Sequence, residues 1–145
     1  LSTQLQYKKW TLSMNFRGSQ GNDVYNNTAN NLMYLTNLPG RNVLKDALSS
    51  GVGPGEAKLF SSRFVEDGSY FRMDALGYDF AIPALRLKRA HVYFSAQNLF
   101  VITGYSGLDP EVNTDVTGNG VAPLGIDYLS YPKARTFTLG INLSF

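Results

Sequence analysis

The 145-residue sequence contains no cysteine, one histidine and few charged side chains. The absence of cysteine excludes disulfide scaffolds, thiolate metal sites and cysteine nucleophiles, and a single histidine excludes two-histidine metal sites. Charged residues make up 17% of the chain, whereas ordinary soluble domains have about 25%. The formal net charge of +2 is too small to indicate a nucleic-acid partner.

Long apolar runs are also missing. No stretch approaches the roughly 18 consecutive apolar residues of a membrane helix, and residues 1–5 lack the basic and apolar regions of a secretory signal. The chain does not begin with methionine. We therefore expect it to be part of a longer protein.

The sequence does contain long stretches in which apolar residues alternate with small polar ones. A period of two residues is typical of a β-strand with one apolar face. The pattern is clearest at the C-terminus, where Phe137 and Leu139 alternate with Thr136 and Thr138. It predicts strands at about residues 2–7, 10–20, 69–80, 86–103 and 132–145.

Within the third strand the alternation changes phase. Phe71 and Met73 occupy odd positions, whereas Leu76 and Tyr78 occupy even ones. A β-bulge near 74–75 would return both sets to the same face.

The predicted strands are joined alternately by short and long connections. Lys8 and Lys9 form a tight turn between the first two strands, and residues 81–85 form a second short turn. Residues 21–62 and 104–130 are long polar loops, with a helical turn expected near 43–48. Short turns on one side and long loops on the other are typical of outer-membrane barrels.

Strand length and composition favour a membrane barrel over a soluble sandwich. Soluble strands are usually about 5 to 6 residues long, whereas a tilted membrane strand needs about 9 to 11. The face opposite the apolar one carries Thr, Ser, Asn, Gln, Arg and Gly, most of them small and uncharged. The expected fold is therefore an all-β antiparallel meander, and since the smallest membrane barrels have about 8 strands, it must belong to a larger barrel. A soluble secreted β domain that binds carbohydrate is the alternative.

Several segments are distinctive: RFVEDGSYFR (63–72), VYFSAQNLF (92–100), GLDPEV (107–112), GIDY (125–128), YP (131–132) and RTFTLGINLSF (135–145). In this order they resemble the C-terminal strands of SusC/RagA-type TonB-dependent outer-membrane transporters. The resemblance covers about residues 60–145, and the third strand is shorter after Met73 than is usual in the family.

The resemblance implies a barrel of about 22 strands around an N-terminal plug. It also implies a SusD-like surface lipoprotein as partner, and energy from the TonB–ExbB–ExbD complex. The substrate would be an oligosaccharide or, as in some members, a peptide. The plug and the TonB box are expected to lie outside these residues, and we expect neither enzymatic activity nor a cofactor.

Two sets of residues are candidates for function. The first resembles the signal that the barrel assembly machinery reads on the last strand. It comprises Phe137, Leu139, Ile141, Leu143 and Phe145. The second consists of loop amides and aromatic rings that could contact a sugar: Asn22, Asn26, Asn27, Tyr34, Tyr105 and Tyr128.

Two further patterns have simpler interpretations. Asp109 and Glu111, with Asp115 and Asn119 nearby, suggest calcium ligands, but the spacing does not match an EF-hand and no metal site is expected. His91 is interpreted as a polar residue of a barrel lumen.

Overall fold

The computed structural model describes residues 1–53, 55–56, 59–82, 89–112 and 125–144. The chain divides into two compact units. The sheet unit comprises Leu1–Ser19, Tyr70–Thr103 and Lys133–Phe145, and the loop unit comprises Gln20–Ser69 and Gly104–Pro132. Within the described ranges, no helix is both long and apolar enough to span a membrane.

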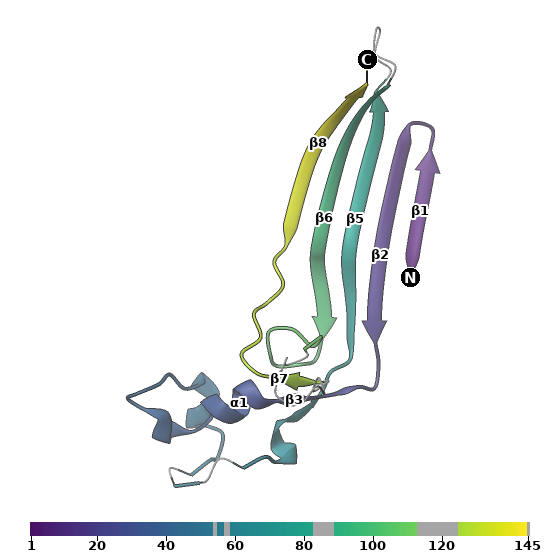
Figure 1. Ribbon diagram of the computed structural model, residues 1–145. Helices are drawn as coiled ribbons and strands as arrows, with labels where there is room; N and C mark the ends of the chain where they lie inside the picture. Colours follow the sequence, from purple (N-terminus) through teal and green to yellow (C-terminus); the bar gives the residue numbers. More distant parts are fainter. Residues whose placement is uncertain (54, 57–58, 83–88, 113–124, 145) are drawn as a thin grey trace, which may run out of the picture. The chain divides into compact units, whose positions relative to one another are not determined.

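The sheet unit is a single five-stranded antiparallel meander (Figure 1). Its strands follow one another in the order β1-β2-β5-β6-β8. They are β1 (Ser2–Tyr7), β2 (Trp10–Ser19), β5 (Tyr70–Ile82), β6 (Arg89–Thr103) and β8 (Thr136–Ser144). The expected all-β antiparallel meander of five strands is confirmed; four of them are long, whereas β1 has six residues.

The first two strands form the predicted tight hairpin. Tyr7 lies opposite Trp10, which leaves only Lys8 and Lys9 for the turn. Lys8 has a φ of 55°, the left-handed conformation that two-residue hairpin turns favour.

The register of the strands collects the apolar side chains on one face. Trp10 lies opposite Phe80, Phe80 opposite Val92, and Val92 opposite Ile141. The rings of Trp10 and Phe80 are 3.9 Å apart between centroids. The neighbouring rows consist of Leu12, Tyr78, Phe94 and Leu139, then Met14, Leu76, Ala96 and Phe137, then Phe16, Met73 and Phe100.

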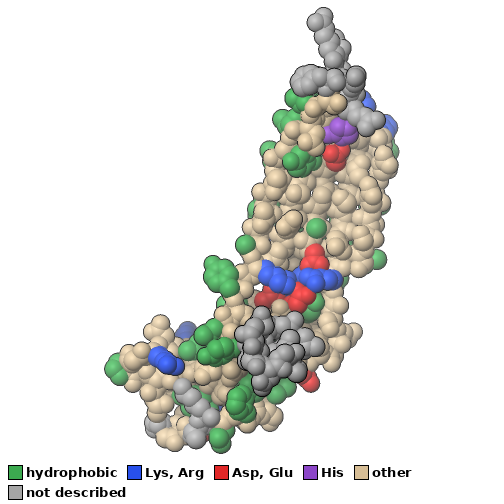
Figure 2. Space-filling view, in the orientation of Figure 1, with side chains coloured by type: hydrophobic (Ala, Val, Ile, Leu, Met, Phe, Trp, Pro, Cys, Tyr) green, Lys and Arg blue, Asp and Glu red, His purple; other side chains and the backbone are tan. Residues whose placement is uncertain are grey.

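The opposite face is polar, with charged side chains at Arg17, Arg72 and Asp79. Its rows contain Thr11, Asp79, Tyr93 and Gly140, then Ser13, Gly77, Ser95 and Thr138, then Asn15, Ala75, Gln97 and Thr136. Figure 2 looks onto this face, where the histidine lies beside an acidic side chain. The two are His91 and Asp79, with 2.9 Å between Nδ1 and Oδ1, so His91 lies on the polar face as expected.

The apolar face remains exposed. Leu139 is 74% exposed, Ile102 65% and Phe137 61%. A continuous apolar surface of this kind marks contact with a membrane or with another protein.

A bulge in β5 keeps the apolar face continuous. Asn15 pairs with Ala75 and Phe16 with Met73, so Asp74 has no opposite residue on β2. Arg17 donates to both carboxylate oxygens of Asp74, over 2.6 Å from Nε and 3.0 Å from Nη2. The bulge predicted near 74–75 is confirmed.

The last strand begins later than the pattern predicts, at Thr136 rather than at residue 132. The ladder with β6 ends at the pair of Gln97 and Thr136. The next residue, Asn98, has a φ of 52°, and its side-chain amide donates to the carbonyl of Lys133 over 2.8 Å. A side-chain contact thus replaces the backbone ladder at this point.

Strand β5 ends two residues later than expected. Ala81 and Ile82 belong to β5 and pair with His91 and Ala90, so the predicted turn at 81–85 is wrong for its first two residues. Its remaining residues and positions 86–88 of the predicted strand lie outside the described residues.

The loop unit is more ordered than the polar composition of 21–62 and 104–130 predicts. It contains a three-stranded sheet of β4 (Val65–Asp67), β3 (Asp23–Asn26) and β7 (Ile126–Asp127). A short helix, α1 (Asn27–Leu32), follows β3. The helical turn expected near 43–48 is a 3₁₀ turn at Lys45–Leu48, and two others lie at Leu35–Asn37 and Ser62–Phe64.

Charged substitutions should have different effects on the two faces of β8. Leu139→Arg would place a cation on the apolar face, at a cost of about 2–4 kcal/mol near the middle of a bilayer. Thr138→Arg, on the polar face of the same strand, should cost little. The folded fraction in outer-membrane preparations, measured by heat-modifiable mobility, should fall for the first variant only. Equal losses would contradict the assignment of faces.

Candidate functional site

The loop unit contains a partly open cavity of about 840 Å³. This volume lies within the range of small-molecule pockets. Its wall is largely aliphatic and includes Leu32, Met33, Leu44, Leu108 and Leu129. The polar groups in the wall come mainly from Asn26, Thr28, Asp46, Glu66, Ser106 and Asp127.

Glu66 on β4 anchors one side of the cavity. Its Oε1 accepts from Asn26 Nδ2 over 2.9 Å and from Ser106 Oγ over 2.8 Å, and its Oε2 accepts from the Ser106 amide over 2.8 Å. Asn26 also caps α1, because its Oδ1 accepts from the Ala29 amide over 2.8 Å. One buried asparagine thereby ties the helix to β4 and to the segment at Ser106.

Asp127 at the end of β7 accepts a second set of hydrogen bonds in the cavity wall. Its Oδ2 accepts from the Tyr105 hydroxyl over 2.7 Å, and its Oδ1 accepts from Thr28 Oγ1 over 3.3 Å and from the Ser130 amide over 3.4 Å. Burial, together with the hydrogen bond to the Asp127 carboxylate, raises the pKa of Tyr105 far above its usual value. Tyr105 therefore remains a hydrogen-bond donor at any physiological pH.

These contacts hold a strained turn after β7. Leu129 has a φ of 53°, a conformation that is costly for a large side chain. Its amide donates to Thr28 Oγ1 over 2.7 Å. The turn exposes Tyr128 (48%), Leu129 (63%) and Tyr131 (91%).

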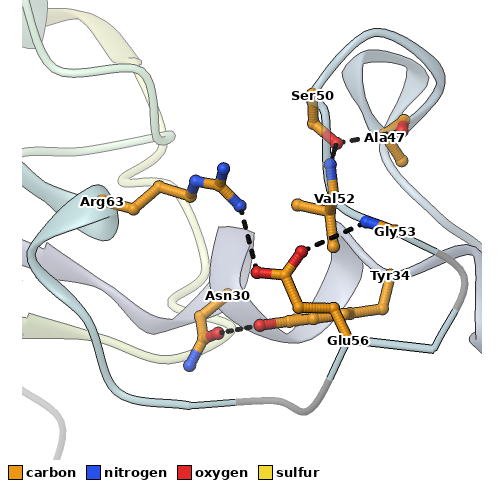
Figure 3. A network of polar contacts seen from close by, with 8 residues as sticks. All are labelled: Asn30, Tyr34, Ala47, Ser50, Val52, Gly53, Glu56 and Arg63. Carbon is orange, nitrogen blue, oxygen red and sulfur yellow. Dashed lines mark hydrogen bonds and ion pairs between the residues drawn. The ribbon is translucent and has the colours of Figure 1, made fainter.

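A second network lies beside α1 (Figure 3). Glu56 accepts from the Gly53 amide over 3.1 Å, and it lies 3.7 Å from the Arg63 guanidinium. Nearby, the Tyr34 hydroxyl donates to Asn30 Oδ1 over 3.4 Å.

The cavity wall carries more negative than positive charge. Asp46, Glu66 and Asp127 face one basic residue, Arg63, which already contacts Glu56. The whole loop unit has nine acidic and four basic residues, a net charge of −5. The sheet unit has two acidic and nine basic residues, a net charge of +7.

Three of the six predicted sugar contacts are buried within the loop unit. Asn26 and Tyr34 are each 3% exposed and Tyr105 is 5% exposed, and all three make the hydrogen bonds described above. Of these, Asn26 lines the cavity.

The other three are more accessible. Asn22 Nδ2 donates to the Gly68 carbonyl over 3.1 Å, and Asn27 Oδ1 accepts from Asn31 Nδ2 over 3.1 Å. Tyr128 is half exposed in the turn after β7.

Sequence reasoning missed the residues that organise the cavity. Thr28, Glu66, Ser106 and Asp127 are polar loop residues far apart in the chain, and only the fold brings them together. Glu66 and Asp127 do lie within two of the segments that resemble the transporter family, which is the only signal that could have found them.

The predicted assembly-signal residues share one face of β8. Phe137, Leu139, Ile141 and Leu143 lie opposite the apolar residues of β6 and are all more than half exposed. Phe145 lies outside the described residues.

Asp109 shows no sign of a calcium site. It is buried, and its Oδ1 accepts from the Glu111 amide over 2.9 Å. Asp115 and Asn119 lie outside the described residues, and within the described ranges no three acidic or histidine side chains are placed to hold a metal ion.

Comparisons with known proteins show which proteins this chain is similar to. No protein-family model matches the chain. It is 32% identical to TonB-dependent receptor P3 of Formosa agariphila, over 99% of the chain and 16% of that protein. It is also 32% identical to TonB-dependent receptor SusC of Bacteroides thetaiotaomicron, over 100% of the chain and 15% of that protein.

The chain belongs to the SusC-type TonB-dependent receptors. Receptors of this type are β-barrel proteins of the outer membrane, and so the chain is an outer-membrane protein. It spans about one sixth of the length of these relatives, both of which are named TonB-dependent receptors.

Solved structures agree on the fold. A structure of the RagAB peptide transporter matches 97% of this SusC-type chain with a TM-score of 0.74 and 24% identity, and the match covers 16% of that structure's chain. A closed state of the RagAB peptide importer gives a TM-score of 0.73.

The turn after β7 should loosen when Asp127 loses its tyrosine donor. Tyr105→Phe removes a hydrogen bond to a buried carboxylate, a contact worth about 1.5–3 kcal/mol. Amide hydrogen exchange at Leu129 and Ser130 should therefore speed up in the full-length receptor. Tyr128→Phe, which changes a half-exposed ring, is the matched control. Unchanged exchange in Tyr105→Phe would show that the contact does not hold the turn.

Proposed function

We propose that the chain is the C-terminal part of a barrel that imports nutrients across the outer membrane, with oligosaccharides as the favoured substrate. The observation that carries this proposal is the single-layer sheet, whose apolar face is exposed and whose polar face carries few charges. Five strands leave two unpaired edges, which a lipid environment does not tolerate. Further strands must complete the barrel.

The energy and the partners come from outside these residues. In this proposal a plug and a TonB box couple the barrel to the TonB–ExbB–ExbD complex, and a SusD-like lipoprotein binds at the outer loops. The barrel assembly machinery inserts the protein, reading the last strand by edge pairing. The relatives named SusC and RagAB support the partnership with a lipoprotein.

The loop unit is the proposed place of substrate contact. Tyr131 in the cavity wall and Tyr128 in the turn after β7 expose aromatic rings, and such rings combine a large apolar face with a polar hydroxyl. In this proposal Asn22 and Asn27 add amide contacts, while Asn26, Tyr34 and Tyr105 hold the framework behind them.

A peptide is the second candidate substrate. The aliphatic wall formed by Leu32, Met33 and Leu44 would suit apolar peptide side chains better than sugar hydroxyls. The structurally similar RagAB is described as a peptide transporter. A soluble carbohydrate-binding domain is not supported, because the exposed apolar face would make it aggregate.

Growth experiments test the proposal and separate the two substrates. A strain that lacks the full-length gene should lose growth on one class, glycans or peptides, and complementation should restore it only while TonB is present. Growth on every tested substrate without the gene, or restoration without TonB, would overturn the proposed import.

The aromatic rings give a sharper test. Tyr128→Ala and Tyr131→Ala should each lower uptake of the identified substrate, by about 5-fold or more if the ring stacks on it. Leu59→Ala, an exposed loop residue outside the cavity lining, is the control. Unchanged uptake in both tyrosine variants would show that the turn after β7 does not contact the substrate.

The charge of the cavity predicts a preference against anionic substrates. Asp46 is exposed in the cavity wall, and a charge contact at such a site is worth about 0.2–1 kcal/mol. Asp46→Lys should therefore raise the uptake of a sulfated or acidic substrate relative to its neutral form, by about 2- to 5-fold. Asp46→Asn should give a smaller rise. If neither variant changed the relative uptake, the charge of the cavity would play no part in selecting the substrate.

A further inference from the structure

The apolar pattern of β8 does not by itself determine its register on β6. Because the side chains of a strand alternate, a slip by one residue would turn the apolar set to the other face, but a slip by two residues would not. After such a slip in either direction, three of the four residues Phe137, Leu139, Ile141 and Leu143 would still lie opposite apolar residues of β6. Some other contact must distinguish the registers.

Tyr93 and Gly140 supply such a contact on the polar face. They lie opposite each other on β6 and β8. A β-carbon built on Gly140 would meet Cζ, Oη and Cε1 of Tyr93 at less than 2.7 Å, closer than real β-carbons approach other atoms. The tyrosine ring therefore lies over the glycine, in space that only glycine leaves open.

Exposure agrees with this geometry. Gly140 is the one residue among Thr136–Ser144 that is not exposed. The polar face of β8 otherwise carries Thr136, Thr138 and Asn142, all with side chains that would occupy the space under the ring. A slip by two residues would place Thr138 or Asn142 opposite Tyr93.

Neighbouring contacts do not have the same selectivity. Asn98 binds the Lys133 carbonyl, but every residue of a slipped strand offers a carbonyl in its place. Gly77 lies against Ser13, whose side chain is small, and that pair joins β2 to β5 rather than β6 to β8.

We propose that Tyr93 and Gly140 form a register lock, an interlocking pair that selects one of the two-residue-spaced registers when the last strand pairs with β6. Phe137, Leu139, Ile141 and Leu143 determine which face meets lipid. The lock determines where along β6 the strand stops.

Engineered cysteine pairs measure the register directly, since the chain has no cysteine of its own. In the native register Ser95 lies opposite Thr138, and opposite residues are close enough for a disulfide. The slip that brings Asn142 under Tyr93 pairs Gln97 with Thr138, and the reverse slip pairs Ser95 with Thr136. Each cysteine pair is introduced separately into the full-length receptor, in which any other cysteines have been replaced. Disulfide formation is scored only in the folded protein, which is identified by its heat-modifiable mobility.

The expected results are specific to the lock. Without further changes, the 95–138 disulfide should dominate both slipped pairs. Tyr93→Gly should lower the yield of the 95–138 disulfide relative to the slipped pairs by about 5-fold or more, while the barrel still assembles. Gly140→Val should reduce the folded yield, and the double variant Tyr93→Gly with Gly140→Val should recover it, because the clash is gone.

Thr138→Val, on the same face but opposite the small Ser95, is the matched control and should leave the folded yield unchanged. Three outcomes would overturn the proposal: an unchanged ratio in Tyr93→Gly, a wild-type folded yield in Gly140→Val, or no recovery in the double variant.

Discussion

A β-strand turns successive side chains to opposite faces, and every property of the sheet unit depends on this constraint. Five strands are aligned so that one face is apolar from Trp10 on β2 to Ile141 on β8. Because the sheet is a single layer, this face stays exposed rather than forming a protein core. The bulge at Asp74 matters for the same reason, since it keeps both halves of β5 in phase.

The loop unit follows a different principle. Its order comes from two acidic side chains, Glu66 and Asp127, which gather donors from distant segments. Those donors are neutral groups, and the unit as a whole carries a formal net charge of −5. The proposed selection against anionic substrates and the fixed display of Tyr128 therefore have a common physical origin.

The sequence was sufficient for the features that depend on local alternation: the five strands, the Lys8–Lys9 turn and the bulge in β5. It was insufficient where a side chain replaces the backbone ladder, as Asn98 does at Lys133, which moved the start of β8 to Thr136. It also missed the cavity, because the contact of Tyr105 with Asp127 spans 22 residues and that of Thr28 with Asp127 spans 99. No periodicity marks such contacts.

The central claim is that one face of this sheet meets lipid and the other a polar interior. Spin labels placed one at a time along β8, from residue 136 to 143, in the reconstituted full-length receptor measure this most directly. Collision with oxygen, which concentrates in lipid, should be high at 137, 139, 141 and 143, and collision with a water-soluble nickel chelate should be high at 136, 138 and 142. Equal accessibility at odd and even positions would contradict the account.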